Sequence, residues 1–334
     1  MTQTRSSLAR AAIYAVLVAF TIYNVLPFCW TILNSLKLPK DANARTPRFL
    51  FQPTGEHYAD LWLNMRPDDF APYGLALLLI IFALVVIVFY ASRLPAPNGL
   101  IYAAVAAASL GLLLGLPRVV NTAEFYDYLV NSVIVTMGTL VVSLSFGALA
   151  GYGLARYRHV ISVVILVLAL AFRSLPSLAL VLPFYYLGQL SGLYDTHILL
   201  ILCLVAVNQP FTIWMLRSFF MEIPREIEEA AMIDGAGRLR SFLSVIVPIM
   251  GPGIITTGLF TLLLAYNDFL LARILTQINW TLPVGIAQWT GGEDPGHVTL
   301  AAAGSVSVTL PILVVIIFFQ KYLIRGLASG AVKG

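Results

Sequence analysis

The sequence has little charge for its length. Asp, Glu, Lys and Arg make up 11% of the 334 residues, whereas hydrophobic residues make up 59%, and the mean hydropathy is +0.88. A soluble domain carries about 25% charged residues, so this chain cannot cover a water-soluble globule. Intrinsic disorder is excluded as well, because disorder needs low hydrophobicity and high charge. The composition indicates a polytopic membrane protein.

Residues for metal binding and catalysis are also scarce. The two cysteines, Cys29 and Cys203, lie in apolar runs, which excludes a disulfide framework and a cysteine metal site. None of the four histidines has metal-ligand spacing. The chain lacks a Gly-x-x-x-x-Gly-Lys-Ser/Thr phosphate-binding loop and a Gly-x-Ser-x-Gly hydrolase turn. Scattered basic residues argue against nucleic acid, so we expect no cofactor, metal, catalytic site or nucleic-acid partner on this chain.

Long apolar runs are abundant. Each is long enough to span a bilayer as a helix, the form in which a chain satisfies its own backbone polar groups in lipid. The alternation typical of barrel strands is absent. The sequence therefore predicts an all-α membrane protein with about eight transmembrane helices. The runs cover residues 12–33, 73–90, 99–116, 130–154, 160–187, 198–220, 251–271 and 300–322.

The flanks of these runs predict topology. The first run follows Arg5 and Arg10 but exceeds the length of about 7–15 residues typical of a cleaved signal, so we expect a retained span. Most loop Lys and Arg residues fall on the side of the N-terminus, which predicts cytoplasmic N- and C-termini. The second and third runs are near the lower length limit. We interpret residues 73–117 as an inserted two-helix hairpin, and a re-entrant or interfacial hairpin is the alternative.

One polar segment between the later runs, residues 217–248, has its own helix signals. Pro224 suits the first turn of a helix, and glutamates in the next turns suit the helix dipole. Gly235 can end the helix in a left-handed conformation. The segment predicts a short helix, a turn and a second short helix before Pro248. Glutamates stand where a lipid-binding helix carries Lys and Arg, which favours a protein partner.

A few polar residues fall within or beside the apolar runs, where a charge costs about 2.5–3.5 kcal/mol on insertion scales. Arg173 is expected to face the bundle interior, either on a transport pathway or in an ion pair that locks helices. Asn208 and Gln209, beside Pro210, can line a path for hydroxyl-rich solutes or form hydrogen bonds between helices. The candidate pathway residues are Arg173, Asn208, Gln209, Asn267 and Asp268.

The polar segment also resembles a known family. Glu229-Ala230-Ala231, followed by Gly235 and by Val245-x-Val247-Pro248, is similar to the EAA loop of ABC importer permeases. The family pattern ends Ile-x-Leu-Pro, so two aliphatic positions differ. Other segments resemble the carbohydrate branch, in particular the second-subunit type of maltose permeases, closely over residues 120–334 and loosely over 1–60. These segments are Asn131-Ser132, Arg156-Tyr-Arg158, Leu193-Tyr-Asp195-Thr196, Tyr266-Asn267-Asp268-Phe269, Leu282-Pro283-Val284 and the Arg325–Gly334 ending.

The resemblance implies a function and a set of partners. The function is that of a bacterial inner-membrane permease subunit in a binding-protein-dependent, ATP-driven importer of a sugar, oligosaccharide or polyol. The partners would be a second permease subunit, two ATP-binding subunits that hold ATP and Mg, an extracytoplasmic solute-binding protein and membrane lipid. The resemblance assigns the contact with the ATP-binding subunit to Glu229, Ala230, Ala231, Asp234 and Gly235.

The same resemblance divides the chain into three parts. Residues 1–72 hold the first span and an outer loop, 73–117 the hairpin, which typical members lack, and 118–334 the permease core. Two other functions stay open. An ion-coupled secondary carrier would work alone, but such a carrier usually has several carboxylates at the membrane midplane. An ABC permease for a peptide or phosphate is the other alternative.

Overall fold

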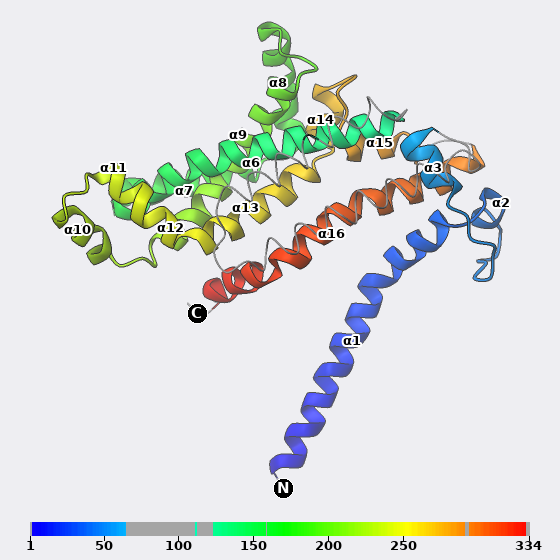
Figure 1. Cartoon of the computed structure of the whole chain (residues 1–334), viewed down its shortest axis with the longest axis horizontal. Coiled ribbons are helices and arrows are strands. Elements are labelled where there is room, and N and C mark those ends of the chain that lie inside the picture. The colour runs from blue at the N-terminus through cyan, green and yellow to red at the C-terminus, as the bar shows by residue number, and fades with distance from the viewer. Residues whose placement is uncertain (1, 65–110, 112–122, 158, 291–293, 332–334) are drawn as a thin grey trace. The chain divides into compact units, whose positions relative to one another are not determined.

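The computed structural model describes residues 2–64, 111, 123–157, 159–290 and 294–331. Regular structure in this part of the chain is helical, without strands, which confirms the all-α fold class (Figure 1). The predicted hairpin at 73–117 lies outside the described residues, apart from Gly111. The chain forms two compact units, residues 1–126 with 286–309 and residues 127–285 with 310–334.

Four helices of the described chain are long and apolar enough to cross a membrane. They confirm the predicted runs at 12–33, 130–154, 198–220 and 300–322. The four are α1 (Thr2–Ser35), α6 (Glu124–Arg156), α9 (His197–Phe220) and α16 (Pro295–Ala331).

Two bends occur beside or within the other described runs. α7 (Val160–Arg173) and α8 (Ser177–Ser191) meet at a 91° bend, because Pro176 disfavours a helical conformation of the residue before it. The prediction of a single helix over 160–187 was therefore wrong. The segment Arg238–Ile249 and α13 (Gly251–Tyr266) meet at 77°, before the predicted run 251–271 begins. That run is one helix as far as Tyr266, where α13 ends. If each bent pair is one span, the described residues hold up to six spans.

The first unit contains α1, α2 (Pro39–Ala42), α3 (Glu56–Leu63) and the first part of α16. The segment after α1 folds around Lys37, whose side chain is buried. Its ammonium donates to Asn34 Oδ1 at 2.9 Å and lies 4.1 Å from the Trp30 ring centroid. Burial lowers the pKa of Lys37, and the Asp41 carboxylate acts against this shift. The first unit thus has a polar core of its own.

The second unit is built on close contact between α6, α9 and α13. A Cβ on Gly147 would lie 2.8 Å from Thr212 Cγ2, and one on Gly151 would lie 3.0 Å from the backbone nitrogen of Arg217. A Cβ on Gly253 would lie 2.8 Å from Phe219. Small residues allow membrane helices to approach closely, so the spacing Gly147-x-x-x-Gly151 serves packing.

Loops at the end of this unit where α9 begins are fixed by polar side chains. Asn131 Oδ1 accepts a hydrogen bond from His197 Nε2 at 2.8 Å, and Asn131 Nδ2 donates to the Trp280 carbonyl at 3.0 Å. Asp195, in a left-handed conformation with φ of 58°, accepts from the successive backbone N–H groups of residues 277–279. Two of the segments that carry the resemblance, Asn131-Ser132 and Leu193–Thr196, therefore take part in one hydrogen-bonded region.

Candidate functional site

The polar segment after α9 folds as a helix, a turn and a second helical stretch. Pro224 precedes α10 (Arg225–Ile233), and Asp234 ends it. Gly235 follows with φ of +87°, the left-handed region that glycine adopts without a steric penalty. The chain then forms α11 (Arg238–Ser241), the π-helical turn η2 (Phe242–Ile246) and α12 (Val247–Ile249). The predicted helix–turn–helix is confirmed, but the second stretch continues through Pro248.

The helix α10 is held to the end of α6 by its middle glutamate. The Tyr152 hydroxyl donates to Glu228 Oε1, and Arg156 Nε donates to Glu228 Oε2 at 2.8 Å. The Arg156 and Glu228 side chains are only 16% and 12% exposed. Hydrogen bonds to an ionised group are stronger than neutral ones. We call Tyr152, Arg156 and Glu228 the Glu228 clamp.

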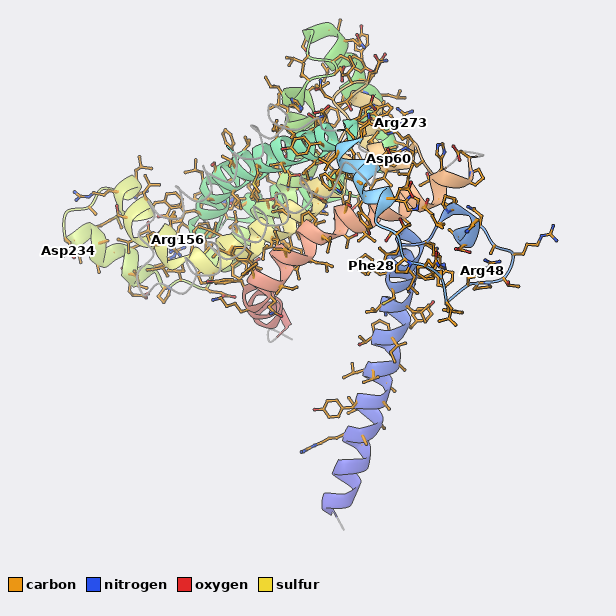
Figure 2. The ribbon with its side chains drawn as sticks, turned by 45° about the vertical axis from the view of Figure 1, so that its right-hand side comes forward. Phe28, Arg48, Asp60, Arg156, Asp234 and Arg273 are labelled. Atoms are coloured by element: carbon orange, nitrogen blue, oxygen red, sulfur yellow. The ribbon has the colours of Figure 1, made fainter. Side chains whose placement is uncertain are left out.

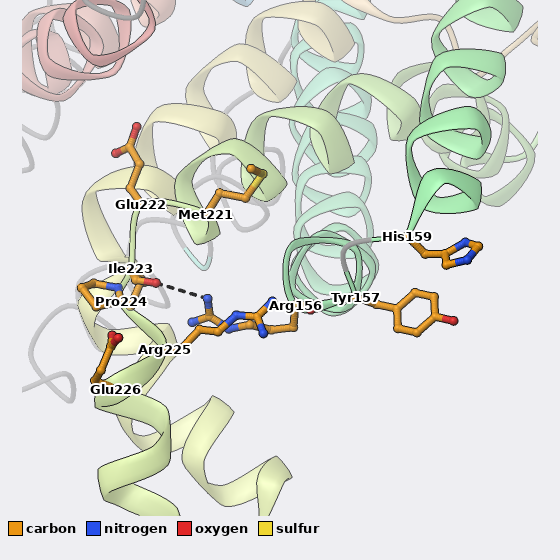
Figure 3. Close-up of a pocket in the computed structure, with 9 residues that line it drawn as sticks. All are labelled: Arg156, Tyr157, His159, Met221, Glu222, Ile223, Pro224, Arg225 and Glu226. Carbon is orange, nitrogen blue, oxygen red and sulfur yellow. Dashed lines mark hydrogen bonds between the residues drawn. The ribbon is translucent and has the colours of Figure 1, made fainter.

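Two arginines also satisfy the carbonyls at the ends of α6 and α9. Arg156 Nη1 donates to the Phe220 and Ile223 carbonyls at 3.4 and 3.2 Å. Arg225 Nη2 donates in return to the Arg156 carbonyl at 2.7 Å. The last carbonyls of a helix lack partners within it and carry partial negative charge. Figure 3 shows both arginines between the end of α6 and the start of α10.

Apolar side chains pack beneath the Glu228 clamp. The Tyr152 ring lies 5.6 Å from the Phe220 ring and 4.7 Å from the Phe242 ring, measured between centroids. Phe220, Phe242 and Ile246 are buried in one cluster, and Ile227 of α10 packs against it. Because polar and apolar contacts act together, α10 is tied to α6, α9 and η2.

An open pocket of 670 Å³ lies beside the start of α10 (Figure 3). Arg156, Arg225 and His159 line it together with Glu222 and Glu226. Both signs of charge occur in its wall, so the pocket does not favour an anion or a cation by net charge.

The predicted coupling residues lie on the outward side of this segment. Glu229, Ala230, Asp234 and Gly235 are exposed, and Ala231 is half-buried. Figure 2 shows Asp234 at the tip of the turn that follows α10, while Arg156 lies at its base. The apolar side chains of Ile233 and Leu239 are 85% and 65% exposed beside them. Exposed apolar groups rimmed by polar ones are typical of a protein interaction surface.

Asn208 and Gln209 lie at the contact of α9 with its neighbours. Gln209 Nε2 donates to the Ser143 carbonyl at 3.2 Å, and its Oε1 is buried without a hydrogen-bond partner among the described residues. Asn208 is buried in α9, and the Thr212 hydroxyl, one turn later, lies 3.1 Å from that of Thr261 on α13. Both residues therefore lie inside the helix bundle.

Asn267 and Asp268 occupy a different place. They follow the end of α13 at Tyr266, so they do not lie within the predicted run 251–271 as part of its helix. Asp268 Oδ1 accepts from the N–H groups of Leu271 and Ala272 at 3.0 and 3.3 Å and caps α14 (Leu270–Leu275). Burial raises the pKa of Asp268, and these two hydrogen bonds act against the shift.

Arg173 is the last residue of α7, at the bend before α8. Its guanidinium carbon lies 4.5 Å from the ring centroid of Phe211 on α9. Its Nη1 is buried and has no hydrogen-bond partner in the described chain. The predicted alternative of an ion pair that locks helices is not observed among these residues.

The sequence did not reveal the Glu228 clamp. By sequence, Glu228 is one of several glutamates that suit a helix N-terminus, and Arg156 is part of a segment that resembles the family. The three clamp residues come from two helices far apart in the sequence. Because no spacing rule connects them, only the folded chain brings them together.

Several candidate spans, together with a helix clamped outside them, define the class of multi-pass helical membrane proteins. The chain belongs to the family of binding-protein-dependent transport system inner membrane components, whose model matches residues 143–329. It is a permease subunit of a transporter.

Relatives with curated names agree with this family. The trehalose transport system permease protein SugB of Mycobacterium tuberculosis is 38% identical over 216 residues, which cover 63% of this chain and 78% of SugB. The trehalose/maltose transport system permease protein MalG of Thermococcus litoralis is 34% identical, over 64% of this chain and 77% of MalG. The inner membrane ABC transporter permease protein YcjP of Escherichia coli is 28% identical over the full length of both chains.

A solved structure shares the fold. It is a bacterial ABC transporter involved in the import of the acidic polysaccharide alginate, with a TM-score of 0.65 and 17% identity. The similarity covers 95% of this chain and 98% of the matched chain.

Proposed function

We propose that the chain is the permease subunit of an ATP-driven importer for a sugar, oligosaccharide or polyol. The names of its relatives support the solute class, since they include transporters of trehalose and maltose. The observation that carries the proposal is the Glu228 clamp. The clamp joins an exposed helix to the end of a span. A permease that is moved by a separate ATP-hydrolysing subunit requires such a connection.

A pair of separate ATP-binding subunits would drive the permease, and these subunits would hold the ATP and Mg. The exposed residues Glu229, Ala230, Asp234 and Gly235, together with half-buried Ala231, would make the contact. A second permease subunit and an extracytoplasmic solute-binding protein would complete the complex, and both chain termini would lie in the cytoplasm. The neighbouring apolar side chains Ile233 and Leu239 give this surface an area that a partner can cover.

Closure of the ATP-binding subunits would displace α10. Because the Glu228 clamp and the aromatic cluster tie α10 to α6 and α9, both spans would tilt with it. The permease would then alternate between inward and outward access, as a two-state element whose equilibrium a ligand elsewhere biases. Arg173, Asn208, Gln209, Asn267 and Asp268 are the candidate residues of the pathway.

Reconstitution tests this function. The chain would be purified with its partner subunits and binding protein, inserted in liposomes and supplied with radiolabelled maltose or trehalose. We expect uptake only with ATP and the complete complex. Uptake by the chain alone, driven by a sodium or proton gradient, would instead establish an ion-coupled carrier. ATP-driven uptake of peptide or phosphate, but of neither sugar, would refute the solute class.

A further inference from the structure

One aromatic ring lies against Arg173 within the second unit, and two further aromatic rings lie beside that ring. Phe211 lies under its guanidinium, and the Phe211 ring is 6.0 Å from both the Trp214 and the Phe260 ring, between centroids. We call Arg173, Phe211, Trp214 and Phe260 the Arg173 cluster. It joins the end of α7 to the middle of α9 and α13.

The Arg173 cluster lies near the middle of the predicted spans 160–187 and 198–220. With a rise of about 1.5 Å per residue, Arg173 is about 20 Å from the start of α7, and Phe211 is about 14 Å from the end of α9. The hydrocarbon core is about 30 Å thick. In spans that cross this layer, both positions would be far from the headgroups, and a long side chain there could reach water only by extending to the interface.

The polar groups of the cluster have no hydrogen-bond partner in the described part of the chain. Arg173 makes no hydrogen bond or ion pair there, and its Nη1 is buried. The indole N–H of Trp214 likewise donates to no described group, although the side chain is 43% exposed. A charge at this depth is costly unless it meets a partner or a water-filled path. Lipid cannot be that partner.

The chemistry of these groups suits a carbohydrate. Aromatic faces offer flat apolar surfaces to the C–H faces of a sugar ring, while a few polar groups orient a ligand. The planar guanidinium offers a fork of N–H donors to neighbouring hydroxyl or carboxylate oxygens. Cation–π contact with Phe211 holds the guanidinium in place without consuming these donors.

We propose that the Arg173 cluster is a contact site for a hydroxyl-rich solute on its way through the membrane. The proposal rests on the proposed function, and it narrows the pathway to a defined site. Gln209 does not belong to this site because its amide already bonds across to α6. Asn267 and Asp268 do not belong to it because they lie beyond the end of α13.

Cysteine accessibility tests whether the cluster faces water. In the complete complex with Cys29→Ser and Cys203→Ala, Trp214→Cys would be treated with a small, membrane-impermeant methanethiosulfonate. Leu168→Cys is the matched control, since Leu168 is 55% exposed on α7 but outside the cluster. We expect Trp214→Cys to react about tenfold faster and to be protected by saturating maltose or trehalose. Absence of reaction, both without nucleotide and after vanadate trapping, would overturn the proposal and assign the cluster to a protein interface.

Transport kinetics give the second readout. Arg173→Met should raise the KM for maltose or trehalose about tenfold. Arg173→Lys should raise the KM less, because Lys keeps the positive charge but lacks the planar set of guanidinium N–H donors. A KM equal to wild type in Arg173→Met would refute the contact. If the wild-type complex takes up peptide or phosphate with ATP, but neither sugar, the proposed solute class fails. The reaction of Trp214→Cys still decides whether the cluster lines an aqueous path.

Discussion

At the scale of single residues, Glu228 links the exposed helix to a membrane span through two side chains of α6. Replacing it by Gln leaves the guanidinium of Arg156 with a neutral acceptor, a change of about 1–3 kcal/mol for a largely buried charged group. A coupling energy of this size corresponds to an effect of about 5–150-fold. We expect Glu228→Gln to lower ATP-driven uptake by about tenfold while ATP hydrolysis by the complex continues, as measured in proteoliposomes.

The neighbouring Glu226 provides the control. It is exposed on the same helix, and its side chain makes no hydrogen bond or ion pair within the described chain. Glu226→Gln removes the same charge and should leave uptake near wild type. The exchange Arg156→Glu with Glu228→Arg should recover part of the lost uptake. Equal losses in Glu226→Gln and Glu228→Gln would show that helix charge, rather than the Glu228 clamp, matters.

Asp268 caps α14 and is also a candidate residue of the solute pathway, and substitutions can distinguish these two roles. Its folded pKa is raised by burial, so its contribution to stability is present below the unfolded value of 3.8 and is lost as pH rises through the folded pKa. Asp268→Asn keeps an oxygen that can cap α14 and should remove this pH dependence. Asp268→Ala should cost about 1 kcal/mol. Thermal unfolding of the purified subunit, followed as the pH rises from the unfolded value of 3.8, measures both.

Transport distinguishes the two roles of Asp268. If the residue is only a cap, Asp268→Asn should transport like wild type. A large loss of uptake in Asp268→Asn at unchanged thermal stability would place the carboxylate on the pathway instead.

At the scale of elements, the turn between α10 and α11 depends on one glycine. Gly235 has φ of +87°, and a Cβ there would meet nothing within 4 Å. Gly235→Ala should therefore cost about 1 kcal/mol through backbone strain alone. Proline requires φ near −65°, so Gly235→Pro should displace the exposed helix and abolish coupled uptake, measured as the ratio of solute moved to ATP hydrolysed.

Gly237 is the matched control for this turn. It lies two residues away, has φ of −67° and would also give a Cβ with nothing within 4 Å. Gly237→Ala should therefore leave the coupling ratio unchanged. Wild-type coupling in Gly235→Pro would remove the turn from the mechanism.

At the scale of the whole molecule, the first unit shows that the residues flanking the predicted hairpin lie close together. The Ala123 N–H donates to the Trp62 carbonyl at 3.1 Å, so the residues on either side of segment 65–122 are neighbours. A short linker can join such points. We expect deletion of residues 73–116, with a short Gly-Ser linker, to preserve assembly and part of the ATP-driven uptake. Complete loss of uptake by a normally assembled complex would show that the hairpin takes part in transport.

Much of the fold could be predicted because the insertion of a span into the membrane depends on the residues of that span alone. Lipid selects each span by its own length and apolarity, which is why four of the predicted runs are single helices. The turn at Gly235 could be predicted for the same reason, since a helix end depends on adjacent residues. The separation of the helical stretch before Pro248 from the span that begins at Gly251 was predicted as well. The 91° break at Pro176 was not predicted, because proline also occurs within continuous membrane helices.

The sequence by itself determined that the chain is a helical membrane protein, and its loop pattern indicated the family. Tertiary structure decided which polar residues act together. Glu228 meets Tyr152 and Arg156, and Arg173 meets Phe211 instead of a carboxylate. Span formation depends on the apolarity of consecutive residues. Partner choice depends on distances between helices, which sequence spacing within one helix does not encode.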